Sequence, residues 1–99
     1  MKDWHVYLIR TGDGSLYTGI TINVERRLSE HRQEGARGSR YLRGRGPLEV
    51  VYSGCVGDRG LALRAEGRLK RLSKDRKEAI VSERPTGEQL IAQLGLEAS

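Results

Sequence analysis

The chain has 99 residues and a formal net charge of +5. This length suits one domain over residues 1–99 with a single modest core and is too short for two cores. Its longest apolar run near the start is too short for a signal peptide or a membrane span, so we expect a cytoplasmic protein without membrane contact. Its one cysteine, Cys55, and two histidines exclude an internal disulfide and a zinc-ligand pattern. We expect Cys55 at a strand end or turn.

Two β-strands are predicted first, Val6–Arg10 and Leu16–Ile20, because both segments mix apolar and β-prone residues. The Gly-Asp-Gly sequence between them supplies the positive-φ positions of a tight hairpin. One tyrosine lies in each strand, Tyr7 and Tyr17. With an odd number of loop residues the two tyrosines share one face of the sheet, and with an even number they lie on opposite faces.

A helix is predicted over Val24–Glu34, with Asn23 as its N-cap and Gly35 at its end. Arg27 and His31 lie four residues apart in this segment. They therefore share one side of the helix, next to its buried stripe.

Residues 35–46 are predicted to form a loop, because they hold four glycines and four arginines. Pro47 closes the loop before a third strand, Leu48–Tyr52. A flexible, basic loop that also contains Tyr41 suits contact with a nucleic-acid backbone.

A second helix is predicted from Arg59 to about Leu72, with Asp58 as its N-cap. Its inward stripe consists of four apolar residues, Leu61, Ala65, Leu69 and Leu72. Glu66 lies on the flank of that stripe, at about 100° from its centre by the helical period. The Glu66 carboxylate therefore borders the core.

Two more helices complete the pattern. Ser73 caps Lys74–Glu83, and Thr86 forms a capping box with Gln89 for a short helix that ends at Leu94. The predicted order is strand, strand, helix, strand, helix, helix and a short terminal helix. A three-stranded sheet with helices packed on it, in the α+β class, is the natural layered fold for this order and length.

The positive charge is concentrated in two segments. Residues 26–45 hold seven arginines against two glutamates, residues 59–77 hold eight basic against two acidic residues, and all other residues sum to −6. This pattern is typical of a surface that contacts phosphates, although a solvated basic face explains it equally well.

Five pieces of the sequence resemble the GIY-YIG nuclease domain in order and spacing, especially its small stand-alone bacterial members: VYLI, LYTGIT, NVERRLSEH, RGRGP and LALRAEGRLKRLSKDRKEAIV. The resemblance covers about residues 5–81 and leaves 82–99 as a helical tail. It implies that the three-stranded sheet is antiparallel. The first family motif matches His5-Val6-Tyr7 and the second matches Tyr17-Thr18-Gly19. Unlike many members, this chain has no asparagine downstream of Glu66.

The glycine of the second motif, Gly19, lies inside a predicted strand. Glycine there indicates close approach of another backbone, so the first helix or the substrate would come near Tyr17, or it marks only a strand end.

The resemblance also implies a catalytic set, which consists of Tyr7, Tyr17, Arg27, His31 and Glu66. Glu66 would bind Mg²⁺ or Mn²⁺ as nearly the only protein ligand, and Tyr7 would be the general base toward the attacking water. Arg27 would bind the scissile phosphate, and His31 would hydrogen-bond the tyrosine or phosphate side. The expected function is a metal-dependent endonuclease that hydrolyses DNA, with branched or single-stranded repair and recombination intermediates as substrates and RNA as the second choice.

The expected contacts to the nucleic-acid backbone are Arg26, Arg40, Arg43, Arg45 and Lys70. Taken singly, the site residues also suit structural roles; Glu66, for example, has the i,i+4 spacing of an ion pair with Lys70. Two other functions therefore stay open, a catalytically weak DNA- or RNA-binding module and a structural or partner-binding domain with solubilising arginines. Salt-dependent binding and metal-dependent cleavage separate the three.

Overall fold

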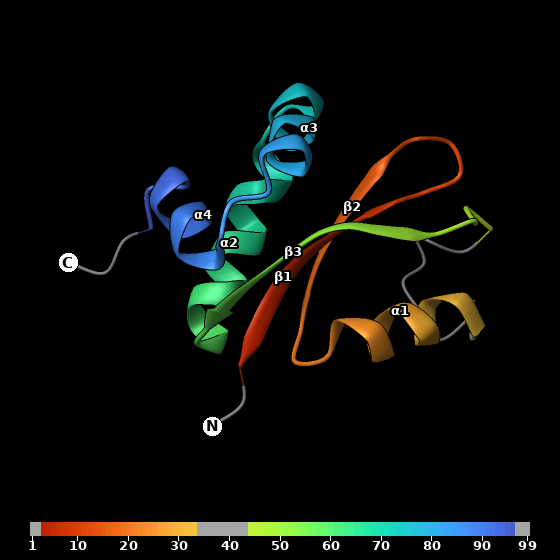
Figure 1. The fold of residues 1–99 in the computed structure, drawn as a ribbon, viewed down its shortest axis with the longest axis horizontal. Coiled ribbons are helices and arrows are strands. Elements are labelled where there is room, and N and C mark those ends of the chain that lie inside the picture. The colour runs from red at the N-terminus through yellow and green to blue at the C-terminus, as the bar shows by residue number, and fades with distance from the viewer. Residues whose placement is uncertain (1–2, 34–43, 97–99) are drawn as a thin grey trace.

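The computed structural model describes residues 3–33 and 44–96. Within these residues the chain forms three strands and four helices, in the predicted order (Figure 1). Their bounds are β1 Trp4–Arg10, β2 Leu16–Thr21, α1 Val24–Gln33, β3 Glu49–Gly57, α2 Arg59–Arg71, α3 Lys74–Glu83 and α4 Gly87–Gln93. The α+β class is confirmed. None of the described helices is long and apolar enough to cross a membrane.

The sheet is antiparallel with the strand order β2-β1-β3, so β1 is central and both other strands are edges. In the β1–β2 pair, Tyr7 lies opposite Gly19 and Ile9 lies opposite Tyr17. The connecting loop, residues 11–15, has an odd number of residues. Tyr7 and Tyr17 therefore share one face of the sheet, because side chains of opposed residues point to the same side.

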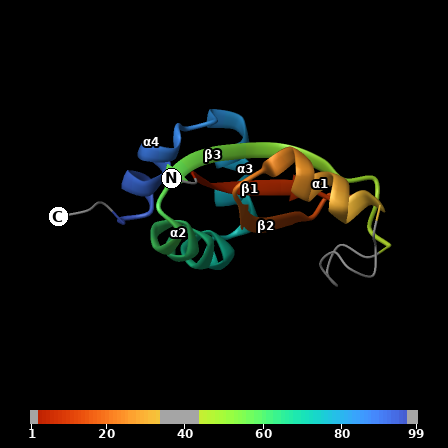
Figure 2. The same cartoon turned by 90° about the horizontal axis from the view of Figure 1, so that it is seen from below.

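Helices cover both faces of the sheet, with α1 on one face and α2, α3 and α4 on the other (Figures 1 and 2). The larger core lies under α2, α3 and α4 and includes Val6 and Leu8 of β1. The smaller core lies under α1 and includes Tyr7 and Ile9. Alternate residues of the central strand thus enter different cores, which explains why the run from Val6 to Ile9 is continuously buried. The structure differs here from the single core expected from the length, because helices cover both faces of the sheet.

The helix starts follow the predicted capping chemistry. The side chain of Asp58 accepts a hydrogen bond from the backbone N–H of Leu61, and Ser73 caps α3 in the same way. Thr86 and Gln89 form both hydrogen bonds of a capping box. Such caps contribute about 1 kcal/mol each to helix stability.

The third strand is longer than the predicted Leu48–Tyr52, because β3 begins at Glu49 and continues to Gly57. The small residues after Tyr52 continue the strand and allow close packing. A β-carbon on Gly54 would collide with the Tyr52 ring, which crosses it so that the hydroxyl can donate to the carbonyl of Pro85 at 2.8 Å.

Helix α4 also packs on β3 through a glycine that leaves room for a close contact. A β-carbon on Gly87 would collide with the backbone of Cys55, so only glycine lets the first turn of α4 approach the strand. Cys55 is exposed and lies within β3, two residues before its end. The expectation of a strand-end position is therefore close, and the turn alternative is wrong.

Candidate active site

The candidate site begins at Tyr7, whose side chain is only 2% exposed and lies on the α1 face. Its ring crosses the neighbouring strand at Gly19, where a β-carbon would collide with both the ring and the hydroxyl. The close approach expected at Gly19 is therefore made by the Tyr7 ring. The missing side chain at position 19 lets the Tyr7 hydroxyl extend over β2, the edge strand of the sheet.

Helix α1 places His31 between the two tyrosines. The His31 Nε2 atom lies 3.4 Å from the Tyr7 hydroxyl oxygen, a buried hydrogen bond in which the donor depends on the imidazole tautomer. The ring of Tyr17 meets the ring of His31 edge to face, with centroids 6.0 Å apart and planes at 75°. One histidine thus contacts both tyrosines, which come from different strands.

Arg27 lies one turn before His31, and its guanidinium is 3.3 Å from the Glu30 carboxylate. The Arg27 side chain is 35% exposed, so one part of it reaches solvent while its charge acts on Tyr7. Sequence reasoning missed Glu30, although its i,i+3 spacing from Arg27 on a helix is a signal for such a pair.

The pKa values of the two central groups are shifted. Burial raises the pKa of Tyr7 to about 12, the nearby Tyr17 and Glu66 add to the increase, and Arg27 opposes it. For His31, burial and then the charge of Arg27 lower the pKa, with Glu30 opposing. Around neutral pH the site therefore contains a protonated phenol next to a neutral imidazole.

Glu66 belongs to α2, on the other side of the sheet, yet its charge acts on Tyr7. The two residues come within electrostatic reach because α2 packs against β2, the edge strand over which the Tyr7 hydroxyl extends. The Glu66 side chain is 21% exposed, as expected for the flank of an apolar stripe, and Lys70 lies 3.5 Å from its carboxylate.

The donor set suits one hard divalent cation. Mg²⁺ takes oxygen ligands and usually keeps several waters, so one or two carboxylates are enough when substrate phosphates add further oxygens. Glu66 offers a partly exposed carboxylate within electrostatic reach of the Tyr7 phenol. Among the described residues there is no group of three or more histidines, cysteines or carboxylates that could form an all-protein metal cage.

The predicted contacts to nucleic acid differ in their surroundings. Arg26 is exposed on α1, and Lys70 forms an ion pair with Glu66. Arg45 pairs with Asp13 at 2.8 Å, which places this arginine against the loop between β1 and β2. Arg40 and Arg43 fall outside the described residues.

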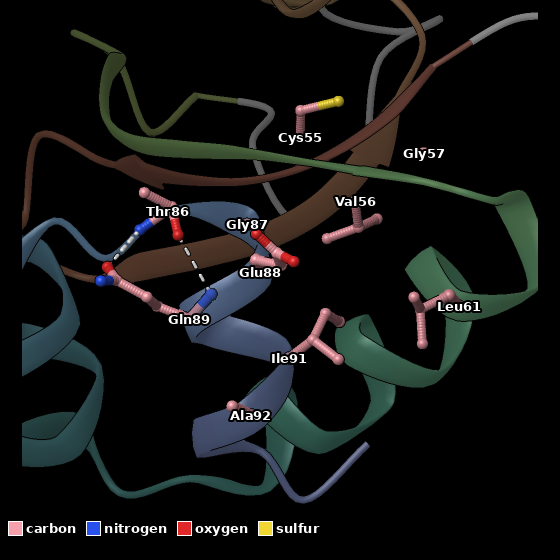
Figure 3. A pocket seen from close by; sticks show the side chains of 10 residues that line it. All are labelled: Cys55, Val56, Gly57, Leu61, Thr86, Gly87, Glu88, Gln89, Ile91 and Ala92. Carbon is pink, nitrogen blue, oxygen red and sulfur yellow. Dashed lines mark hydrogen bonds between the residues drawn. The ribbon is translucent and has the colours of Figure 1, made fainter. Parts of the chain in front are cut away.

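A large groove lies elsewhere, between β3, α2 and α4 (Figure 3), with a volume of about 1010 Å³. Its walls are mainly apolar, and the capping box of Thr86 and Gln89 lies at its edge. Within residues 3–33 and 44–96, Glu88 is the only charged residue that lines it. A lining without a cation does not suit phosphate, and none of the predicted site residues that the structure describes belongs to it.

The chain is similar to known proteins over most of its length. Residues 3–79 match the family model of the GIY-YIG catalytic domain. The chain is 50% identical over 94 residues to the UPF0213 protein YhbQ of Escherichia coli strain K12, covering 95% of this chain and 92% of that protein. YhbQ of Escherichia fergusonii matches to the same extent. The solution NMR structure of the UPF0213 protein BH0048 from Bacillus halodurans is similar at a TM-score of 0.54 and 34% identity, covering 96% of this chain and 99% of that one.

Proposed function

The chain belongs to the GIY-YIG catalytic domain family, and from that premise we propose that it is a metal-dependent endonuclease that hydrolyses phosphodiester bonds in DNA. The observation that carries the proposal is the contact of Tyr7 with His31, within electrostatic reach of both Arg27 and Glu66. A packing role for the tyrosines does not require a buried hydroxyl to contact an imidazole within electrostatic reach of a guanidinium and a carboxylate. A hydrolytic site uses all four.

Arg27 binds the scissile phosphate in this proposal. A guanidinium presents several N–H donors in a fixed plane, which matches the oxygens of a phosphate better than an ammonium does. As negative charge grows on those oxygens in the transition state, the same donors stabilise it. Glu66 is the residue that would hold Mg²⁺ or Mn²⁺, and the bound ion would supply Lewis-acid stabilisation of the phosphate charge.

Tyr7 accepts the proton of the attacking water, for which its hydroxyl must first be ionised. A phenol with a pKa of about 12 is ionised in only about one molecule in 100,000 at pH 7, so the site must favour the phenolate. Arg27 contributes to this by its charge. Neutral His31 provides the acceptor: the Tyr7 proton passes to the His31 Nε2 atom, and the Tyr7 oxygen then takes the proton of water.

The substrates that suit the proposal are single-stranded, flapped or branched DNA. A chain of 99 residues cannot enclose a long duplex, and the arginines contact the backbone, which is the same in every sequence. We therefore expect cleavage without marked sequence preference. RNA is the second choice of substrate.

A catalytically weak nucleic-acid-binding module is the second candidate function. It is favoured by one observation, the nearly complete burial of Tyr7, which raises its pKa and opposes its use as a base. This function keeps the basic residues but does not need Tyr7 to ionise.

Cleavage assays with highly purified protein separate the two candidates. Labelled duplex, single-stranded and 5′-flap oligonucleotides are incubated with Mg²⁺, with Mn²⁺ or with a chelator. The proposal predicts cleavage with either ion, fastest on the flap and single strand, and none with the chelator. Salt-dependent binding without cleavage of DNA or RNA would instead assign the chain as a binding module.

A further inference from the structure

A small cavity of about 330 Å³ lies along the outer edge of β2, where that strand meets α2 and α3. It is lined by Leu16, Tyr17, Thr18, Lys70 and Lys77. The only charged groups among these residues are the two ammonium groups. The cavity is therefore positively charged, and Tyr17 connects it with the candidate active site, because the same tyrosine ring contacts His31.

Thr18 lines this cavity, but its hydroxyl is buried. The residue is 3% exposed, and within the part of the chain that the structure describes its Oγ1 atom has no hydrogen-bond partner. Most buried hydroxyls in folded proteins are paired, because an unpaired polar group away from water is costly. Solvent does not reach this hydroxyl, so the charged groups that a ligand in the cavity would meet are the two ammonium groups.

Lys77 contributes a cation that is only partly exposed and has no acidic partner among the described residues. Its neighbour Glu78 is engaged by Arg10 through two hydrogen bonds of 2.7 and 2.6 Å. Lys74, one turn earlier, donates instead to the carbonyl of Gly14. The ammonium group of Lys77 is therefore available to an anion.

We propose that this cavity binds a backbone phosphate of the nucleic acid next to the one that is cleaved. The inference rests on the proposed function, which makes nucleic acid the ligand. The two lysines of the cavity independently indicate that the ligand is negatively charged. Lys77 and Lys70 donate to the non-bridging oxygens. Lys70 lies between the cavity and the candidate active site, because it lines the cavity and its ammonium group is 3.5 Å from the Glu66 carboxylate.

The bound strand then follows the edge of β2. Its scissile phosphate lies at Tyr7 and Glu66, and the neighbouring phosphate lies at Lys77 near the start of α3. Because phosphates carry no sequence information, this second contact fixes the position of the strand but selects no base.

The test compares three variants in a chelating buffer, where no metal-dependent cleavage disturbs binding. Lys77→Met removes the proposed contact, Lys77→Arg keeps the charge, and Arg76→Met removes an exposed cation of the same helix that does not line the cavity. Affinity for a labelled single-stranded oligonucleotide is measured at several salt concentrations. We expect Lys77→Met to weaken binding about tenfold and to reduce the salt slope by about one, while the other two variants stay close to wild type.

Unchanged affinity and slope in Lys77→Met, together with cleavage by the wild type, would overturn the phosphate site and leave the nuclease proposal standing. A second measurement covers a wild type that neither cleaves nor binds oligonucleotides. Thymidine 3′,5′-bisphosphate is titrated while the backbone amide NMR signals of Thr18 and Lys77 are followed. Shifts that disappear in Lys77→Met would support a phosphate site that is independent of nuclease activity, and an absence of shifts would overturn it.

Discussion

The ring of Tyr7 occupies the space beside Gly19 that a β-carbon would need. Gly19→Ala must therefore displace the ring and with it the hydroxyl that contacts His31. We expect a loss of about 1–3 kcal/mol in the free energy of unfolding, as for other overpacked cores. Because a shift of about 1 Å in a reacting group can cost a factor of about 100, cleavage should fall by a similar factor. Urea denaturation and cleavage assays measure the two effects.

Gly67→Ala is the matched control, since it makes the same chemical change on α2. A β-carbon on Gly67 has nothing within 4 Å outside the helix, so the gain in helix propensity should stabilise the fold by up to about 1 kcal/mol. Opposite signs for the two glycines would support the packing of Tyr7 over β2. Equal effects would contradict it.

The ionisation of Tyr7 gives a prediction about stability at high pH. Burial raises its pKa in the folded protein to about 12, as it does for Tyr52, from an ordinary value of 10.0. A raised pKa stabilises the folded state at every pH below the ordinary value, and this stabilisation is lost as the pH rises from about 10 to 12. Tyr7→Phe should reduce this loss and remove one late-ionising phenol from an ultraviolet absorbance titration. An unaltered titration above pH 10 would show that the Tyr7 phenol is not buried.

Arg26 and Arg27 are adjacent in the sequence but differ in their surroundings, because Arg26 is exposed and Arg27 acts on Tyr7. Arg27→Met should slow single-turnover cleavage about 100- to 1000-fold, as expected when a donor to the developing charge is lost. Arg26→Met should change mainly the affinity for DNA, by a few-fold at low salt. Similar losses of cleavage rate in both variants would mean that the rate depends on the total positive charge of α1 and not on the position of Arg27.

The basic loop gives a prediction about binding. Replacing Arg40, Arg43 and Arg45 together by glutamine should weaken binding to DNA of every sequence and lower its salt dependence. Arg45→Gln alone should have the smallest effect, because Asp13 already neutralises that guanidinium at 2.8 Å. Binding titrations at several salt concentrations test this. Unchanged binding in the triple variant would remove the loop from the binding surface.

Much of the fold could be predicted because local patterns determine it. Strand alternation left two arrangements for Tyr7 and Tyr17, and the odd number of loop residues in the structure selects the one with both on one face. The helical period placed Arg27 and His31 on one side of α1. The length of β3 could not be predicted, because its small residues are explained only by partners far away in the sequence. Gly54, for example, is required by the Tyr52 ring that crosses it to reach Pro85.

In the candidate site, too, local patterns predicted some features, and contacts between distant elements determine the others. Glu66 was predicted on the border of the core from its own helix, but its action on Tyr7 depends on how α2 packs against the edge strand. Thr18 is the middle residue of the second family motif, and Lys77 belongs to no motif. Only the packing of α3 near β2 brings the two residues to one cavity. A helical period cannot specify such contacts between elements.

The central claim is that Glu66 serves the chemistry while the basic residues hold the strand. Its most direct test measures Mg²⁺-dependent cleavage and DNA binding in parallel for Glu66→Gln and for Glu83→Gln, an exposed glutamate at the end of α3. We predict that Glu66→Gln lowers cleavage at least about 100-fold while its affinity for DNA stays within about threefold of wild type, because only the metal ligand is lost. Glu83→Gln should cleave like wild type. Undiminished cleavage by highly purified Glu66→Gln would contradict the claim and place the reaction at another site.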